Sequence, residues 1–75
     1  MNISDVMIHI NEPLSVDARS SLEEDMRRIE GVIAPRFSPG KEHLLMIAFV
    51  PEKTSSAVLL AKARAAGYTA QRVGA

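Results

Sequence analysis

Apolar residues recur along this 75-residue chain at two different spacings, one typical of strands and one of helices. The order in which these spacings alternate restricts the chain to few folds. A half-buried strand has apolar residues at every second position, whereas an amphipathic helix has them three and four residues apart. The period of two comes first, where Val6, Ile8 and Ile10 alternate with other residues until Pro13. We therefore expect a strand here, with these three side chains on its buried face.

The helical period follows directly. Ser15 is a suitable N-cap, and Leu22, Met26 and Ile29 then recur at spacings of four and three. Gly31 is typical of the residue that follows a helix C-terminus. We therefore expect a first helix between Ser15 and Gly31, with one apolar stripe facing the core.

The middle of the chain predicts a β-hairpin. Residues 32–38 form a short apolar segment that contains Pro35, which cannot donate a ladder hydrogen bond and so favours an edge strand. The pair Pro39-Gly40 is a strong turn signal. Residues 43–50, HLLMIAFV, are nearly all apolar, which predicts a central strand covered on both faces.

A second helix and a last strand complete the pattern. Residues 54–56, Thr-Ser-Ser, supply an N-cap region, and Gly67 is expected to end a helix that runs to about Ala66. Residues 69–73 can form a final short strand. The buried side of this helix is expected to use Leu59, Leu60, Ala63 and Ala66.

The resulting order is βαββαβ. Two interleaved right-handed β-α-β units of this kind give the ferredoxin-like fold of the α+β class. We therefore expect one domain over residues 1–75, with a four-stranded antiparallel sheet and both helices on one face.

Composition narrows the function classes. Nine basic and nine acidic residues leave no formal net charge, which argues against a general nucleic-acid binder. No apolar run reaches the roughly 20 residues of a membrane span, and the first residues lack the pattern of a signal peptide, so we expect a cytoplasmic domain. The chain has no cysteine, which excludes disulfides, thiolate metal sites and a cysteine nucleophile.

Three phrases, in order, carry a family resemblance: LEEDMRRIEGV, MIAFVPEKTSS and AKARAAGYTAQRV. Together they resemble the heavy-metal-associated domain of copper chaperones and metal-transport ATPases. The resemblance implies the ferredoxin-like fold and a metal loop of the form Gly-Met-x-Cys-x-x-Cys, with Tyr68 beside it. It also indicates a metal-handling protein as a docking partner for this chain.

The chain departs from the family at that loop, which aligns with EPLSVDA, residues 12–18. Ser15 and Ala18 then occupy the two cysteine positions. A soft cation such as Cu(I) favours thiolate ligands; a serine hydroxyl is a poor substitute and alanine is none. We therefore interpret the loop as scaffold, in which Ser15 caps the helix and Asp17 favours its dipole.

A different soft-metal site is an alternative. If Val6, Ile8 and Ile10 face the helices, Met7 and His9 lie on the open face of the sheet, where Met46 of the neighbouring strand could approach them. Thioether and imidazole are suitable copper ligands. The competing interpretation is an ordinary sheet face, because methionine most often serves as adaptable packing.

The same face predicts a contact surface. Alternate side chains of a strand at residues 43–50 point to opposite faces of the sheet, and both sets are largely apolar. Whichever set packs on the helices therefore leaves an apolar set outside, and such patches commonly mark association sites. The expected interaction face consists of Met7, His9, Leu44, Met46 and Ala48. We expect a second copy or another protein to bind there.

The remaining polar residues have simpler interpretations. Glu23 with Arg27, and Glu24 with Arg28, are spaced for ion pairs along the first helix. His43 is interpreted as a solvated residue at the start of a strand. Because no nucleophile–base arrangement is evident, we expect no catalytic residue and no enzymatic activity.

Overall fold

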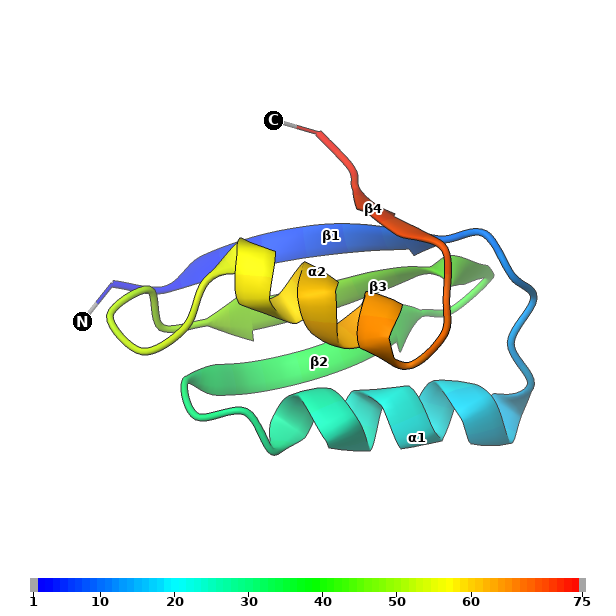
Figure 1. Ribbon diagram of the computed structural model, residues 1–75, viewed down its shortest axis with the longest axis horizontal. Helices are drawn as coiled ribbons and strands as arrows, with labels where there is room; N and C mark the ends of the chain where they lie inside the picture. The colour runs from blue at the N-terminus through cyan, green and yellow to red at the C-terminus, as the bar shows by residue number, and fades with distance from the viewer. Residues whose placement is uncertain (1, 75) are drawn as a thin grey trace.

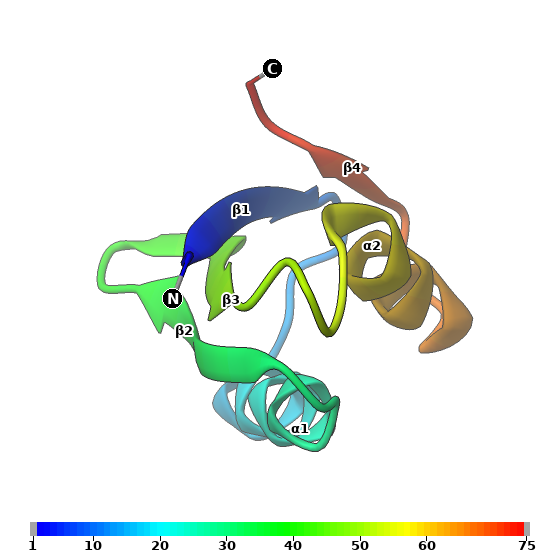
Figure 2. The ribbon, with the colours of Figure 1, turned by 90° about the vertical axis from the view of Figure 1, so that its left-hand side faces the viewer.

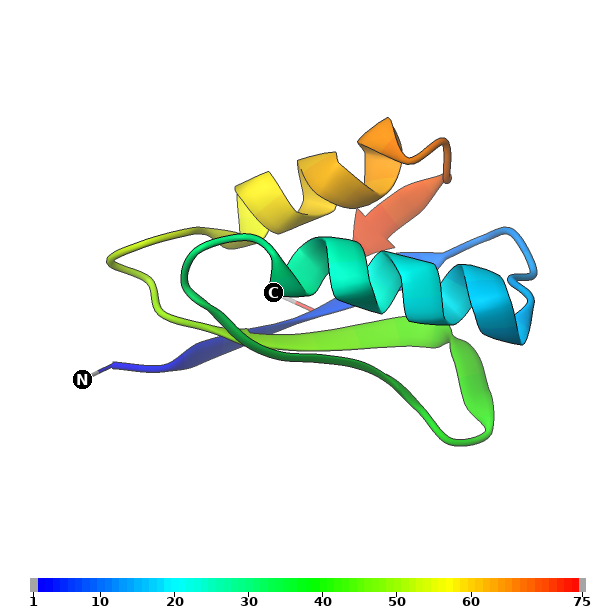
Figure 3. The ribbon, with the colours of Figure 1, turned by 90° about the horizontal axis from the view of Figure 1, so that it is seen from below.

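Four strands form one antiparallel sheet, and both helices lie against the same side of it, in a computed structural model that describes residues 2–74 (Figures 1 and 3). The strand order is β2-β3-β1-β4. This is the expected ferredoxin-like arrangement. The elements are β1 (Ser4–Ile10), α1 (Val16–Arg27), β2 (Val32–Ser38), β3 (Lys41–Phe49), α2 (Ser56–Ala65) and β4 (Ala70–Arg72).

The core fills the space between the sheet and the helices. The alternation read from the sequence holds, because Ile8 and Ile10 of β1 are fully buried on the helix side. The other buried apolar residues are Leu14, Leu22, Met26, Leu45, Ile47, Phe49, Leu59, Ala63 and Ala70. Neither helix within residues 2–74 has the length and hydrophobicity needed to cross a bilayer.

The outer edge of the sheet at β2 is closed to further strands. Pro35, opposite Ile47 in the register, has no N–H to offer. The N–H of Phe37 is taken by the carboxylate of Glu23 on α1, at 2.9 Å. The expected edge position of β2 is therefore confirmed, and α1 masks the edge that Pro35 interrupts.

The first helix ends earlier than expected. It stops at Arg27, and the N–H of Ile29 bonds to Met26 O at 3.0 Å in the turn that follows. Gly31 lies in that turn, with φ of +98°, where a Cβ would come within 2.8 Å of Lys53 Cβ. Glycine at position 31 thus permits a left-handed backbone conformation and the close approach of two chain segments, and it does not mark the end of the helix.

Other expectations on the two helices are also corrected. Ala66 is exposed, because it caps the C-terminus of α2 and is not part of the buried face. Of the ion pairs expected on α1, neither forms: Arg27 pairs with Glu24 instead, and Glu23 turns to the edge of the sheet. For Glu23, a hydrogen bond to the otherwise unpaired N–H of Phe37 stabilises the fold more than an exposed ion pair with Arg27 would.

The strand β3 is central but covered on one face only. Its buried set is Leu45, Ile47 and Phe49, whereas the residues between them are half-buried. In Figure 2 both helices lie on one side of the sheet, and the other side carries no element of the described chain. The prediction of a strand covered on both faces is therefore wrong for the isolated chain.

Candidate functional site

The loop between β1 and α1 is organised around the start of the helix. Ser15 has an extended backbone, and its Oγ accepts a hydrogen bond from the N–H of Ala18 at 3.1 Å, so it is the expected N-cap. Asp17 lies in the first turn, where its charge favours the helix dipole. Ala18 packs partly buried against the core. The two positions at which the resemblance places cysteines thus begin a helix here.

The same loop is tied to the segment that precedes β4. The carboxylate of Glu12 accepts the N–H of Thr69 at 2.8 and 3.1 Å, and the N–H of Asn11 bonds to Thr69 O at 2.9 Å. The bond from the Thr69 backbone lowers the pKa of Glu12, because it stabilises the ionised form. Sequence reasoning missed this contact, since the two residues are 57 positions apart.

The interior of the loop is also occupied. Leu14 is buried in the core, and its carbonyl oxygen accepts a hydrogen bond from the Arg19 guanidinium at 2.7 Å. Tyr68, the residue expected beside a metal loop, is half-buried against the core. The loop is therefore held by the chain's own donors and acceptors.

The residues expected to form the interaction face do come together on the open side of the sheet. In the β1–β3 register Met7 lies opposite Met46, His9 opposite Leu44, and Asp5 opposite Ala48. All except Asp5 are half-buried. The most exposed large apolar residues lie elsewhere, at Ile3, Val16, Ile33, Val58 and Val73. The apolar side chains of this face therefore partly shield one another.

Two charged residues flank this face. Asp5 on β1 and Arg36 on β2 are both exposed and line a shallow depression of about 190 Å³. Ala34, Met46 and Ala48 form much of its floor. Within residues 2–74 neither Asp5 nor Arg36 has an ion-pair partner. An acid and a base thus stand on opposite sides of β3 with small and flexible apolar residues between them.

The candidate copper ligands are adjacent, and one of the three is already engaged. Met46 Sδ accepts a hydrogen bond from Ser38 Oγ at 3.4 Å. The His9 ring stacks on His43, with ring centroids 5.8 Å apart and an interplanar angle of 17°, and its buried Nδ1 has no hydrogen-bond partner. Among residues 2–74 no cluster of three His, Asp or Glu side chains is arranged to hold a metal ion.

His43 is not the solvated residue that the sequence suggested. It is half-buried, and its Nδ1 lies 2.7 Å from Ile10 O. Because a carbonyl oxygen only accepts, Nδ1 carries the proton in this contact. The stacked pair was missed because only the pairing of β1 with β3 brings His9 and His43 together.

No protein-family sequence description matches the chain, and no curated protein sequence does. Solved structures do match. The chain superposes on oxidized MerP from Ralstonia metallidurans CH34 with a TM-score of 0.84 at 16% identity, covering 97% of this chain and 100% of that one. For a copper binding domain from HMA7, a P-type ATPase, the TM-score is 0.82 at 13% identity, covering 93% of both chains.

A third similar structure is the CopZ metallochaperone, with a TM-score of 0.77 at 13% identity over 93% of this chain and 100% of that one. At these identities the likeness concerns the fold. These neighbours are heavy-metal-associated domain proteins, so the resemblance noted in the sequence is confirmed at the level of the fold. The chain therefore has the fold of the heavy-metal-associated domains and no cysteine with which to build a Cys-x-x-Cys metal loop.

Proposed function

We propose that this chain is a non-catalytic, cytoplasmic protein-interaction domain, which keeps the heavy-metal-associated fold without its thiolate metal site and contacts a protein through the open face of the sheet. The observation that carries the proposal is the apolar face of β1 and β3, which neither helix covers. The contacting protein is a second copy of the chain or a metal-handling partner.

The state of the loop supports this proposal. A carrier loop must offer soft donors to the solvent and release them to a partner. Here Ser15 caps the helix, Ala18 has no donor, and Glu12 is held on the Thr69 N–H. These contacts stabilise the fold and leave no thiolate or thioether at the loop.

The composition of the open face supports it as well. Met7 and Met46 are flexible, polarisable side chains that adapt to different partner surfaces. Ala34 and Ala48 allow another backbone to approach the sheet closely. A face of this kind is suited to contact over an area, with Asp5 and Arg36 at its sides to set the orientation.

A second candidate function is soft-metal binding by Met7, His9 and Met46. The observation in its favour is the register, which sets Met7 directly opposite Met46 with His9 two residues along the same strand. The Ser38 hydrogen bond counts against it, because it occupies the Met46 sulfur that a metal would need.

One titration with matched variants separates the two candidates. Purified protein is titrated with Cu(I) and with Zn(II), and the same samples are examined by sedimentation. The variant Met7→Leu/Met46→Leu keeps the apolar surface but removes both thioethers, and His9→Ala removes the imidazole. We expect no tight one-to-one metal binding in the native chain. Tight Cu(I) binding that both variants abolish would establish the metal function and refute the proposal.

A further inference from the structure

We infer that the protein bound by the open face is a second copy of this chain, placed face to face by a two-fold axis that runs along β3, parallel to the plane of the sheet. This inference rests on the proposed function and names the partner of the same surface. It depends on the charges of the face, on the closed edge of the sheet, and on the area available.

The charges on the open face of one copy complement those on the same face of a second copy. A two-fold axis along β3 carries β1 of one copy over β2 of the other, because β3 lies between those strands. Asp5 of each copy then lies over Ala34 of the other, because both residues are level with Ala48. Arg36 is two residues further along β2, about 7 Å away, a distance that its long side chain can span to pair with Asp5, and the same pair forms twice. Both side chains are exposed and lack an ion-pair partner among the described residues. A second copy therefore supplies each charge with its complement.

The edge of the sheet offers a poorer route to self-association. At β2 the ladder is broken by Pro35, and the Phe37 N–H is already bound to Glu23. The opposite edge is β4, which has only three residues, Ala70–Arg72, and covers β1 from Ile8 to Ile10. Pairing through the exposed remainder of β1 would set Asp5 against Asp5, which like charges disfavour. Face-to-face contact avoids both obstacles.

The dimensions of the sheet determine how strong this contact is. Three strands of each copy overlap, β2, β3 and β1, because an axis along β3 carries β4 beyond the other copy's β2. With seven to nine residues each, at about 3.3 Å per residue and about 4.8 Å between strands, they outline a face of roughly 350 Å². Two copies would then bury about 700 Å², which is well below the standard size of stable interfaces and allows only weak association. The expected dimer is therefore concentration-dependent, and dissociates at low protein concentration.

Residues near the two-fold axis contact the same residues of the other copy. In this arrangement Met46 and Ala48 of β3 lie nearest the axis, so a single substitution there acts twice in the dimer. The small side chain of Ala48 allows the two sheets to approach. Ala48→Lys would place two ammonium groups together at the centre of the contact, and it should abolish the dimer while leaving the fold unchanged, since the side chain points away from the core.

The decisive experiment uses reversed charges. Sedimentation is measured up to about 1 mM protein, a range that covers weak association. Asp5→Arg and Arg36→Asp are each expected to weaken dimerisation about tenfold, because two attractive pairs become repulsive. Mixing the two variants should restore dimers, since the introduced arginine of one chain then meets the introduced aspartate of the other, and the native pair forms beside them. The double variant should dimerise like the native chain.

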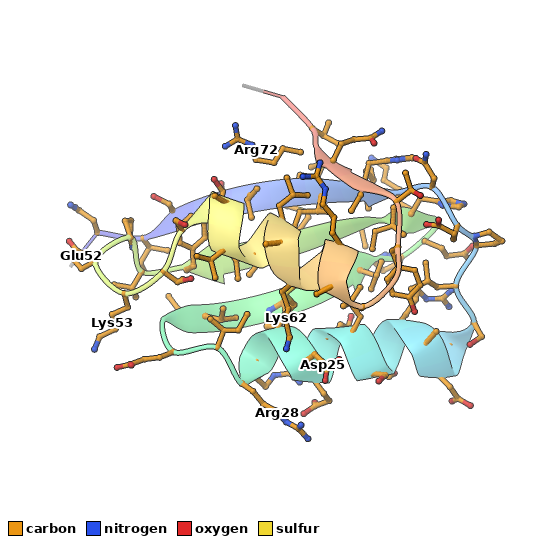
Figure 4. All side chains as sticks on the ribbon, viewed as in Figure 1. Asp25, Arg28, Glu52, Lys53, Lys62 and Arg72 are labelled. Carbon is orange, nitrogen blue, oxygen red and sulfur yellow. The ribbon has the colours of Figure 1, made fainter. Side chains whose placement is uncertain are left out.

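A matched pair on the opposite side of the molecule serves as the control. Asp25 on α1 and Lys62 on α2 line one groove on the helix side, where Figure 4 shows them. Asp25→Arg and Lys62→Asp should leave dimerisation unchanged. An attraction between Asp5 and Arg36 within one chain would explain recovery in the double variant, but not recovery on mixing. Circular dichroism of each variant checks that it remains folded.

Three results would overturn the inference. The native chain could remain monomeric at the highest concentration, its dimer could resist both reversals on the sheet face, or the helix-side reversals could dissociate it. A monomer that binds no metal would leave the proposed contact with another protein standing. Tight metal binding at Met7 and Met46 would instead refute the proposed function itself, so the two failures are distinguishable.

Discussion

We interpret Ser15 as a helix cap rather than as a remnant of a metal ligand. This interpretation predicts both the direction and the size of the change in the free energy of unfolding when Ser15 is replaced. Its Oγ accepts the Ala18 N–H at 3.1 Å, at an exposed site where no other group replaces it. Ser15→Ala should therefore lower the free energy of unfolding by about 1 kcal/mol, the usual cost of losing such a cap. The total free energy of unfolding expected for a chain of this length is roughly 4–11 kcal/mol, so a loss of this size is measurable.

The same chemical change in the middle of the helix should have the opposite sign. Ser21 is exposed within α1, where alanine is the better helix former. Ser21→Ala should raise the free energy of unfolding by a few tenths of a kcal/mol. Ser55→Ala, which removes the equivalent cap of α2 with its 3.2 Å bond to the Val58 N–H, should match Ser15→Ala. Ser15→Asp, which retains an acceptor, should restore most of the stability.

Urea denaturation followed by circular dichroism measures all four variants, with unchanged slopes indicating the same native and denatured states. A loss of about 1 kcal/mol corresponds to a fall of roughly 4–8 °C in Tm for a domain of this size. The reasoning would be refuted if Ser15→Ala left stability unchanged while altering the affinity for Cu(I) or Zn(II). Equal effects of Ser15→Ala and Ser21→Ala would also contradict a capping role.

Three further predictions follow from the contacts of the fold. Leu59→Ala should cost about 2–5 kcal/mol in urea denaturation, because its side chain is fully buried, whereas Val58→Ala, at 49% exposure, should cost much less; equal costs would contradict the placement of α2. Glu12→Gln should be less stable than the native chain at neutral pH. The folded pKa of Glu12 is depressed, so its contribution is present above the pKa of the unfolded chain and is lost as pH falls through the lower, folded value. The two stability curves should therefore converge in acid, and a gap that stays constant with pH would rule out this origin. Gly31→Ala should destabilise by about 1–3 kcal/mol, because φ is +98° and the new Cβ would meet Lys53; a neutral effect in thermal unfolding would show that the turn adjusts freely.

Most of the fold could be predicted from the sequence because its signals are local. The alternation through Ile8 and Ile10, the cap at Ser15, the cap region at residues 54–56 and the turn at Pro39-Gly40 each depend on a few neighbouring residues. The boundaries were less certain, as the early end of α1 shows. Gly31 signals a left-handed residue, but the need for it came from a close approach to Lys53, which no local pattern reveals.

The candidate site was predicted in part. The alternation of β1 and β3 placed Met7, Met46 and Ala48 on one face, because the side-chain period of a strand is fixed at two. Their opposition across the register, and the charges of Asp5 and Arg36 beside them, depend on how three strands align. Register is set by the packing of the whole sheet, and a local pattern specifies it only weakly.

By itself, the sequence determined the order of the elements, the side of each strand that enters the core, and the absence of thiolate chemistry, since these follow from residue type and spacing. Only the tertiary structure decided that Glu12 would hold the Thr69 backbone, that Glu23 would close the edge at Phe37, and that one face of β3 would stay uncovered. Those contacts join residues far apart in the chain, and their free energy arises only once packing has brought the partners together.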